Sequence, residues 1–236
     1  MARLYADLDI DIYQSELRGR QATANRHLGI IRRYSRPSRL LDIGCASGMF
    51  LRRAAADGWS VVGVEPSQQL SRLAKENLDG RGEIIPTTLQ TASLTGAAFD
   101  VVTMWDVLEH VPEPAEFLRT AASLLRPGGH LFVNVPDLDS LQARLLGARW
   151  PLLLPEHLNY FNRGSLAYCG KQAGLLALHM GRRKASFSVE YILYRLRQHG
   201  VLGASAISRL AVRLGAGRIV IPVSLGELYV VLTPRA

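Results

Sequence analysis

The 236-residue chain lacks most of the features that mark secreted, disulfide-rich or membrane-spanning proteins. It has only two cysteines, Cys45 and Cys169, which form neither a disulfide framework nor a metal-ligand spacing and indicate a reducing compartment. It has no run of about 20 apolar residues, the length that a transmembrane helix needs. The first twenty residues carry charges where a signal peptide has an apolar segment, so we expect a cytoplasmic protein.

Acidic residues are scarce in the second half of the chain. The net charge is +8, and residues 142–218 hold twelve Lys or Arg against only two acids, Glu156 and Glu190. Such a segment could meet nucleic acid, anionic lipid or an acidic substrate, or it could form a solvated arginine-rich surface. No RNA-binding module or basic-aromatic platform accompanies it, so nucleic acid is not the expected partner.

What the chain does have is a regular alternation of apolar runs and helical patterns. Strand-like runs cover 39–44, 60–65, 82–87, 99–105 and 130–136. Helical patterns cover 17–34, 48–58, 67–80 and 114–129. The strand-like runs are almost continuously apolar, which is typical of strands buried on both faces of a parallel sheet. The sequence therefore predicts a doubly wound α/β fold, in which ligands bind beyond the carboxyl ends of the strands.

Small residues follow the first predicted strand. Gly44, Ala46 and Gly48 come directly after Asp42, where a ligand can approach the backbone and the start of the next helix. Glu65 lies 21 residues after Gly44, at the end of the second strand, where a carboxylate can accept both ribose hydroxyls. An unpaired carboxylate at Asp42 would be costly inside an apolar strand. We expect it to hold loop amides or a ligand amine, with a purely structural hydrogen bond as the alternative.

Four motifs in order resemble those of class I S-adenosylmethionine-dependent methyltransferases: LLDIGCASGMF, VVGVEPS, FDVVTMWDVLEHVPEP and LLRPGGHLFVNVPD. The resemblance covers about residues 20–180 and is to the type 11/12 subgroup, which is similar to ubiquinone-biosynthesis O-methyltransferases. It implies a Rossmann-like sheet of seven strands with an antiparallel C-terminal hairpin. It also implies S-adenosylmethionine as cofactor and methyl transfer to a small-molecule acceptor, at a hydroxyl oxygen. One departure is Ala46, where the family more often has glycine.

The resemblance assigns cofactor roles to particular residues. Glu65 would bind the ribose hydroxyls, and Pro66 would lie near the adenine. Thr88 and Leu89 would lie at the adenine edge, where Gln90 stands instead of the acidic residue that the family often has nearby.

The methionine end of the cofactor would lie at the first and fourth strands. Residues 44–48 would line the methionine part, with Asp42 beneath it. Trp105 and Asp106 would flank the methionine and sulfonium region, although core packing would also explain the tryptophan.

The resemblance also predicts how the chain is organised. The whole chain, 1–236, is expected to be a single domain, with a helical cap at 1–37, a cofactor-binding core at 38–180, hairpin strands at 175–188 and 226–234, and a helical insert at 189–218. Within the insert an apolar stripe and an arginine pair predict an amphipathic helix. The stripe consists of Ile207, Leu210, Ala211 and Leu214, and the pair of Arg209 and Arg213. Its apolar face could cover the active site, a partner subunit or a membrane surface.

Two histidines are candidate bases for a hydroxyl acceptor. His157 follows the fifth strand in PEHLNYF, and His110 follows the fourth in DVLEHVPEP. Histidine titrates near neutral pH, which suits proton removal, but both side chains could also be structural. No cluster with metal-ligand spacing and no nucleophile elbow is present, so neither a metal nor a catalytic serine is expected.

Three other classes of function remain open on the sequence alone. An NAD-type oxidoreductase shares the glycine turn and the acid after the second strand, but the FDVVTMWDVLEH block has no place in that fold. The basic charge keeps an RNA-methylating or lipid-linked-acceptor methyltransferase open. A non-catalytic interaction protein with this fold would not bind the cofactor.

Overall fold

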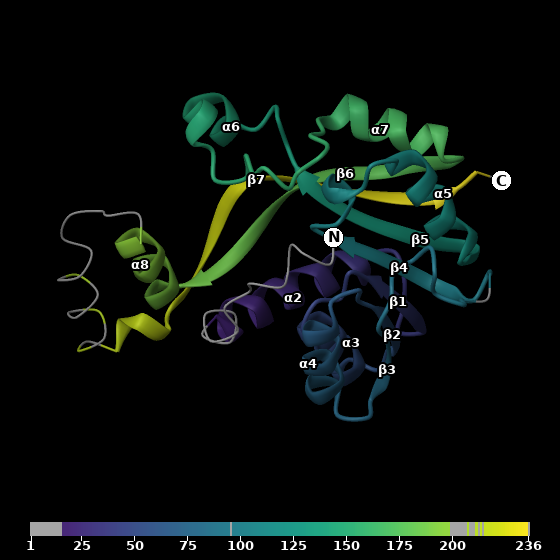
Figure 1. Cartoon of the computed structure of the whole chain (residues 1–236), viewed down its shortest axis with the longest axis horizontal. Coiled ribbons are helices and arrows are strands. Elements are labelled where there is room, and N and C mark those ends of the chain that lie inside the picture. Colours follow the sequence, from purple (N-terminus) through teal and green to yellow (C-terminus); the bar gives the residue numbers. More distant parts are fainter. Residues whose placement is uncertain are drawn as a thin grey trace.

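The structure, a computed structural model, describes residues 16–94, 96–198, 207, 211, 213 and 215–235 (Figure 1). These residues form a seven-stranded sheet in the order β3-β2-β1-β4-β5-β7-β6. The strands are β1 Arg39–Ile43, β2 Ser60–Val64, β3 Gly82–Ile85, β4 Phe99–Trp105, β5 Leu125–Pro136, β6 Leu175–Ser188 and β7 Val220–Pro234. The first five strands run parallel, and β7 pairs antiparallel with both β5 and β6. The predicted fold class, including the antiparallel hairpin, is confirmed.

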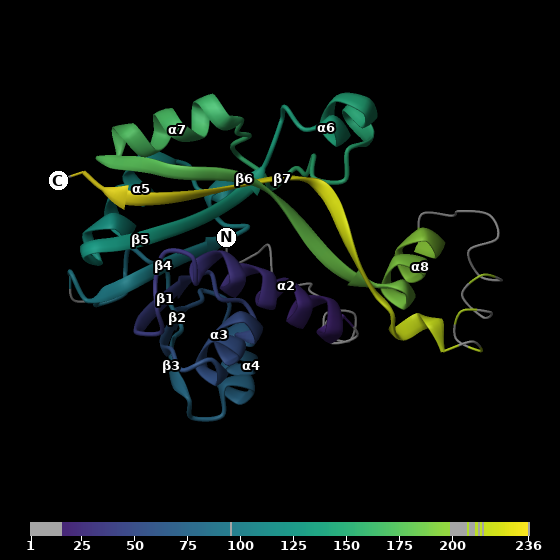
Figure 2. The same ribbon diagram turned by 180° about the vertical axis from the view of Figure 1, so that it is seen from behind.

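Helices cover both faces of the sheet (Figures 1 and 2). One face carries α2 Leu17–Ile31, α3 Met49–Ala56 and α4 Gln68–Leu78. The other carries α5 Pro114–Ser123 and α7 Arg163–Gln172. Neighbouring residues of one strand enter different cores: Leu40 packs with the α2 and α3 side, and Leu41 with the α5 and α7 side. Burial of both faces explains why the strands are apolar without alternation.

The sequence misplaced some boundaries. The helical pattern at 114–129 ends as α5 at Ser123, and β5 begins at Leu125. Pro127 lacks an amide hydrogen, and Gly128 has φ +77°, so this stretch cannot continue a helix. The sequence did not predict α7 or the short helix α6 Leu141–Leu146.

Beyond the sheet, β6 and β7 continue as a two-stranded arm, which we define as residues 183–188 and 220–226; it leads to α8 Val189–Gln198 (Figures 1 and 2). Helix α2 is tied to this arm. The amide of Ser186 donates to Thr23 Oγ1 at 2.9 Å. The amide and hydroxyl of Ser188 donate to the two carboxylate oxygens of Glu16, both at 2.8 Å. The N-terminal helix and the C-terminal arm therefore form one wall.

The predicted amphipathic helix can be followed only in part. Ile207, Ala211 and Arg213 have helical backbone, whereas Arg209, Leu210 and Leu214 lie outside the described residues. The helix therefore stays a prediction, as does the division into cap, core and insert. Among the described residues, no helix combines the length and apolar character needed to cross a membrane.

Candidate functional site

The loop between β1 and α3 is built by left-handed backbone conformations. Gly44, Ala46 and Gly48 have φ of +73°, +48° and +72°. A Cβ on Gly44 would lie 2.6 Å from Val107 Cγ2, and one on Gly48 would lie 3.1 Å from the Ala74 backbone. A side chain at Gly44 would therefore clash and one at Gly48 would be tightly packed, and both positions have the left-handed backbone that favours glycine. Ala46 adopts the same conformation with a methyl group, so the loop keeps its shape at the position where the family more often has glycine.

Glu65 is held by this loop at the end of β2. Its side chain is buried, and its two oxygens accept the amides of Ala46 at 2.9 Å and of Ser67 at 2.8 Å. Burial raises the pKa of the carboxyl group, and the two amide hydrogen bonds partly oppose this rise. Each oxygen retains a lone pair that can accept a further hydrogen bond. The predicted pairing of the glycine loop with Glu65 is thus a direct contact.

Asp42 is buried beneath the same loop. Its Oδ1 lies 2.6 Å from the hydroxyl of Thr103, which also lies 3.3 Å from the carbonyl of Leu41. Burial raises the pKa of Asp42 to about 7, the Thr103 hydrogen bond opposes the rise, and the charge of Glu65 adds to it. The hydrogen bond with Thr103 agrees with the purely structural role that was the alternative for Asp42. Asp42 also lines a cavity, so a ligand amine could still reach its carboxylate.

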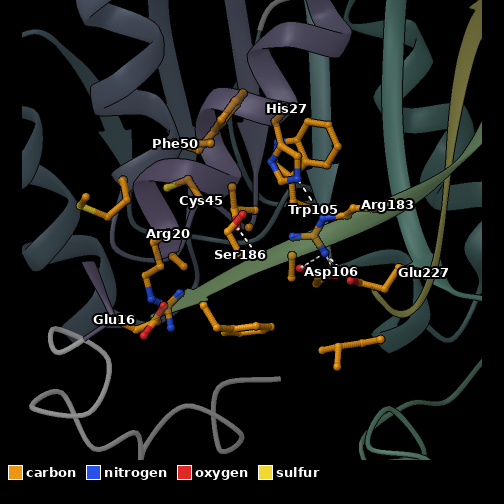
Figure 3. A pocket seen from close by; sticks show the side chains of 18 of the residues that line it. Glu16, Arg20, His27, Cys45, Phe50, Trp105, Asp106, Arg183, Ser186 and Glu227 are labelled. Atoms are coloured by element: carbon orange, nitrogen blue, oxygen red, sulfur yellow. Dashed lines mark hydrogen bonds and ion pairs between the residues drawn. The ribbon is translucent and has the colours of Figure 1, made fainter. Parts of the chain in front are cut away.

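Two cavities meet at Gly44, which lines both. The smaller, of about 40 Å³, contains four of the residues predicted to surround the adenosine, namely Glu65, Pro66, Thr88 and Leu89. The larger, of about 380 Å³, is within the usual size range of small-molecule sites (Figure 3). The predicted residues on its wall are Asp42, Gly44, Ala46, Trp105 and Asp106. The structure therefore brings all the predicted cofactor residues except Gly48, the N-cap of α3, to the walls of these two neighbouring cavities.

A charged cluster that the sequence did not predict lies on the wall of the larger cavity (Figure 3). Arg183 and Glu227 are directly opposite each other on β6 and β7 and form an ion pair. The same guanidinium lies 3.1 Å from Asp106 Oδ1 and donates to His27 Nε2 at 2.9 Å. Asn134 of β5 donates to Asp106 at 2.7 Å. Cationic Arg183 thus lies between an acid of β7, Glu227, and the acid that follows β4, Asp106.

Glu227 has unused hydrogen-bonding capacity in this cluster. It is 4% exposed, and among the described residues its Oε2 has no hydrogen-bond partner. Burial raises its pKa to about 7; the positive charge of Arg183 opposes the rise, and the negative charge of Asp106 adds to it. A buried carboxyl that titrates near neutral pH beside a small-molecule cavity is a candidate proton acceptor.

Trp105 closes one side of the larger cavity. Its ring stacks on His27 with a centroid distance of 3.7 Å and an interplanar angle of 13°. Burial, followed by the charge of Arg183, lowers the pKa of His27 well below its usual value, so this imidazole is neutral. Core packing therefore accounts for one face of Trp105. Asp106, the next residue, has φ +58° and a half-exposed side chain.

The two predicted bases lie together, away from the larger cavity. The rings of His110 and His157 meet edge to face with centroids 4.7 Å apart. His110 lines the smaller cavity, and neither histidine is among the residues that line the larger one. Burial, followed by the charge of His110, lowers the pKa of His157. Their role as bases stays a prediction.

The cluster residues that the sequence reasoning missed carry a recognisable signal. Asn134 interrupts the apolar run LFVNVP, and Glu227 interrupts GELYVV. Isolated polar residues in otherwise buried strands are costly unless they are paired, so each one points to a partner. The missing information was which strands are neighbours.

Solved structures with the same architecture identify the fold. A methyltransferase from Thermotoga maritima, described as S-adenosylmethionine-dependent and as a possible histamine N-methyltransferase, superimposes with a TM-score of 0.63 at 18% identity and covers 99% of both chains. A Haemonchus contortus phosphoethanolamine N-methyltransferase, solved with S-adenosylhomocysteine, gives a TM-score of 0.57 at 17% identity, over 89% of this chain and 53% of that one. The fold is that of class I S-adenosylmethionine-dependent methyltransferases.

Sequence comparison gives the family. Residues 15–179 match the methyltransferase domain family, and the chain belongs to it. A ubiquinone biosynthesis O-methyltransferase of Aeromonas salmonicida is 31% identical over 153 residues, which cover 60% of this chain and 64% of that protein. The corresponding protein of Caulobacter vibrioides is 38% identical over 119 residues, which cover 48% and 47%. The chain thus spans less than two thirds of the length of these relatives.

Proposed function

We propose that this protein transfers the methyl group of S-adenosylmethionine to a hydroxyl oxygen of a small-molecule acceptor. The observation that carries the proposal is the junction of the two cavities at Gly44, beside the buried carboxylate of Glu65. The smaller cavity is lined by the residues expected around an adenosyl group, and the larger continues toward charged residues that can meet an acceptor. The O-methyltransferase names of the relatives support oxygen as the methylated atom.

The chain's own residues fit the cofactor. Gly44 lines both cavities with a left-handed backbone and no side chain, so a ligand can approach the loop closely there. Glu65 would accept the ribose hydroxyls, and Pro66, Thr88 and Leu89 would surround the adenine. When bound, S-adenosylmethionine supplies a methyl group already activated by positive sulfur. The protein then has to align the acceptor and exclude water.

Removal of the acceptor proton is assigned to Glu227. It lines the larger cavity, and its Oε2 has no hydrogen-bond partner among the described residues. The charged groups around it are Arg183 on β6, Asp106 after β4 and Glu109 between β4 and α5. Arg183 lowers the pKa of Glu227 and so favours its charged form, and it stays paired with Asp106 after Glu227 has taken up the proton. His157 and His110 remain the alternative bases, and they require an acceptor that extends out of the larger cavity.

The proposal is tested by calorimetric titration with S-adenosylhomocysteine, with NAD titrated in parallel. We expect binding of S-adenosylhomocysteine and none of NAD. Glu65→Ala should weaken the binding at least tenfold, because it removes the ribose acceptor and leaves the amides of Ala46 and Ser67 without their partner. Glu76→Ala, on the exposed surface of α4, is the matched control and should bind as the wild type does.

Two results would overturn the cofactor assignment. One is the absence of heat with S-adenosylhomocysteine, and the other is an unchanged dissociation constant in Glu65→Ala. If the cofactor binds and no methylated product forms with a panel of catechols and phenols, the hydroxyl acceptor is wrong while the cofactor site stands.

A further inference from the structure

A buried carboxylate and two imidazoles from distant parts of the chain converge beside the smaller cavity. Glu109 and His110 belong to the 3-10 helix η1 Leu108–His110, which follows β4, and His157 belongs to the loop before α7. One ligand atom from each side chain lies within 4.8 Å of the other two. We propose that these three side chains bind one divalent transition-metal ion, with Zn²⁺ as the expected metal.

Two of the three side chains have polar atoms that are buried and unused. Glu109 is 1% exposed, and its Oε2 has no hydrogen-bond partner among the described residues. The Nδ1 of His157 is also buried without a partner there. A buried polar atom left without a partner destabilises the folded protein, and a charged one does so more strongly. A cation placed between these atoms would satisfy both.

The third side chain is held in the correct tautomer for a ligand. His110 Nδ1 lies 3.0 Å from the carbonyl oxygen of Glu156. Because a carbonyl can only accept, Nδ1 carries the hydrogen, and the neutral ring has its lone pair on Nε2. Histidines that bind metals usually donate their other N–H to a carbonyl or carboxylate in this way. The ring is thus oriented by the same loop that supplies His157.

Backbone hydrogen bonds fix the two segments against each other. The amide of Asn159 donates to the carbonyl of Glu109 at 3.0 Å, and its side-chain amide donates to the carbonyl of Val111 at 2.6 Å. The scaffold of the site is therefore formed before any metal binds. Ligand atoms around tetrahedral zinc are about 3.3 Å apart, so the three ligand atoms, which lie within 4.8 Å of one another, have to move closer together when the ion binds.

The donor set favours zinc over the common alkaline-earth ions. Two imidazole nitrogens and one carboxylate suit Zn²⁺, whereas Mg²⁺ and Ca²⁺ prefer oxygen ligands alone. Neither Glu109 nor His157 lines the larger cavity, but His110 lines the smaller one. The ion would therefore hold the loop containing His157 against η1 at the wall of the smaller cavity.

The experiment is a Zn²⁺ titration of the chelator-treated protein by calorimetry, with Co²⁺ absorption spectra as the second readout. We expect one Zn²⁺ per chain and a visible Co²⁺ band typical of histidine ligands. Glu109→Gln and His157→Ala should each weaken Zn²⁺ binding at least tenfold, because each removes one of three ligands. His179→Ala removes an exposed imidazole elsewhere and should bind zinc as the wild type does.

Two outcomes would overturn the inference: wild-type protein that binds no more zinc than His157→Ala does, or His179→Ala that loses as much affinity as His157→Ala. If Glu109→Gln does not fold, His157→Ala gives the same comparison, since His157 lies in a loop and is only partly buried. Neither readout depends on methyl transfer, so failure of the proposed function would leave this test intact.

Discussion

Replacement of Asp42 by asparagine should reduce the stability that the protein loses between pH 5 and pH 8. In the native state burial raises the pKa of Asp42 to about 7, compared with 3.8 for the free side chain. An acid whose pKa is raised on folding contributes its full stability below pH 4, and this contribution is lost as the pH rises through 7. Asparagine resembles the protonated acid and can still hydrogen-bond to Thr103, so Asp42→Asn avoids this loss.

The expected magnitude follows from the two pKa values. Between pH 5 and pH 8, ionisation of buried Asp42 should lower the unfolding free energy of the wild type by about 2.5 kcal/mol. The variant has no ionisable group at this position and should not show this decrease. The assay is urea unfolding of both proteins at the two pH values, without cofactor. The difference in unfolding free energy between variant and wild type should grow in favour of the variant by this amount. Asp139→Asn, at a half-exposed side chain, is the control and should show no such growth. A difference that is the same at both pH values would refute the burial argument.

Two further predictions concern the charged cluster. Glu227→Gln should lower kcat about 10²- to 10⁴-fold and abolish the rise of kcat through pH 7, whereas Glu227→Asp should restore part of both. If kcat of Glu227→Gln still rises through pH 7, the base is another residue, and His157→Ala is the next variant to measure. Arg183→Met should lower the unfolding free energy by about 3–5 kcal/mol in a denaturant titration, because Asp106 and Glu227 lose their buried partner. Arg182→Met, on the exposed side of β6, should change it by less than about 0.5 kcal/mol, and equal effects of the two would contradict this account.

The sequence predicted those parts of the site whose information is local. The loop from Gly44 to Gly48 and its acid at Glu65 belong to one βαβ unit, so a single spacing describes them. The end of each parallel strand was also predictable, because burial on both faces leaves a continuous apolar run. Asp42 and Trp105 could therefore be placed at the same edge of the sheet.

The remaining parts depend on contacts between segments far apart in the chain. Arg183 meets Glu227 because β6 and β7 pair in one register, and a shift of one residue would place these side chains on opposite faces. Glu109 and His110 meet His157 across separations of 48 and 47 residues, which no motif spacing describes. The helix α7 lacks a strong apolar stripe, and its capping box at Asn162 and Ser165 is its clearest local signal.

The arm of β6 and β7 borders the proposed acceptor cavity and lies apart from the proposed nucleoside site. Ala185, Ser186 and Phe187 border the larger cavity from the arm, whereas the surroundings of Glu65 come from the parallel half of the sheet. Under the proposed function, substitutions confined to the arm should change which compound is accepted and leave binding of the nucleoside intact. Exchange of this ribbon between relatives would be a direct route to enzymes with new selectivity.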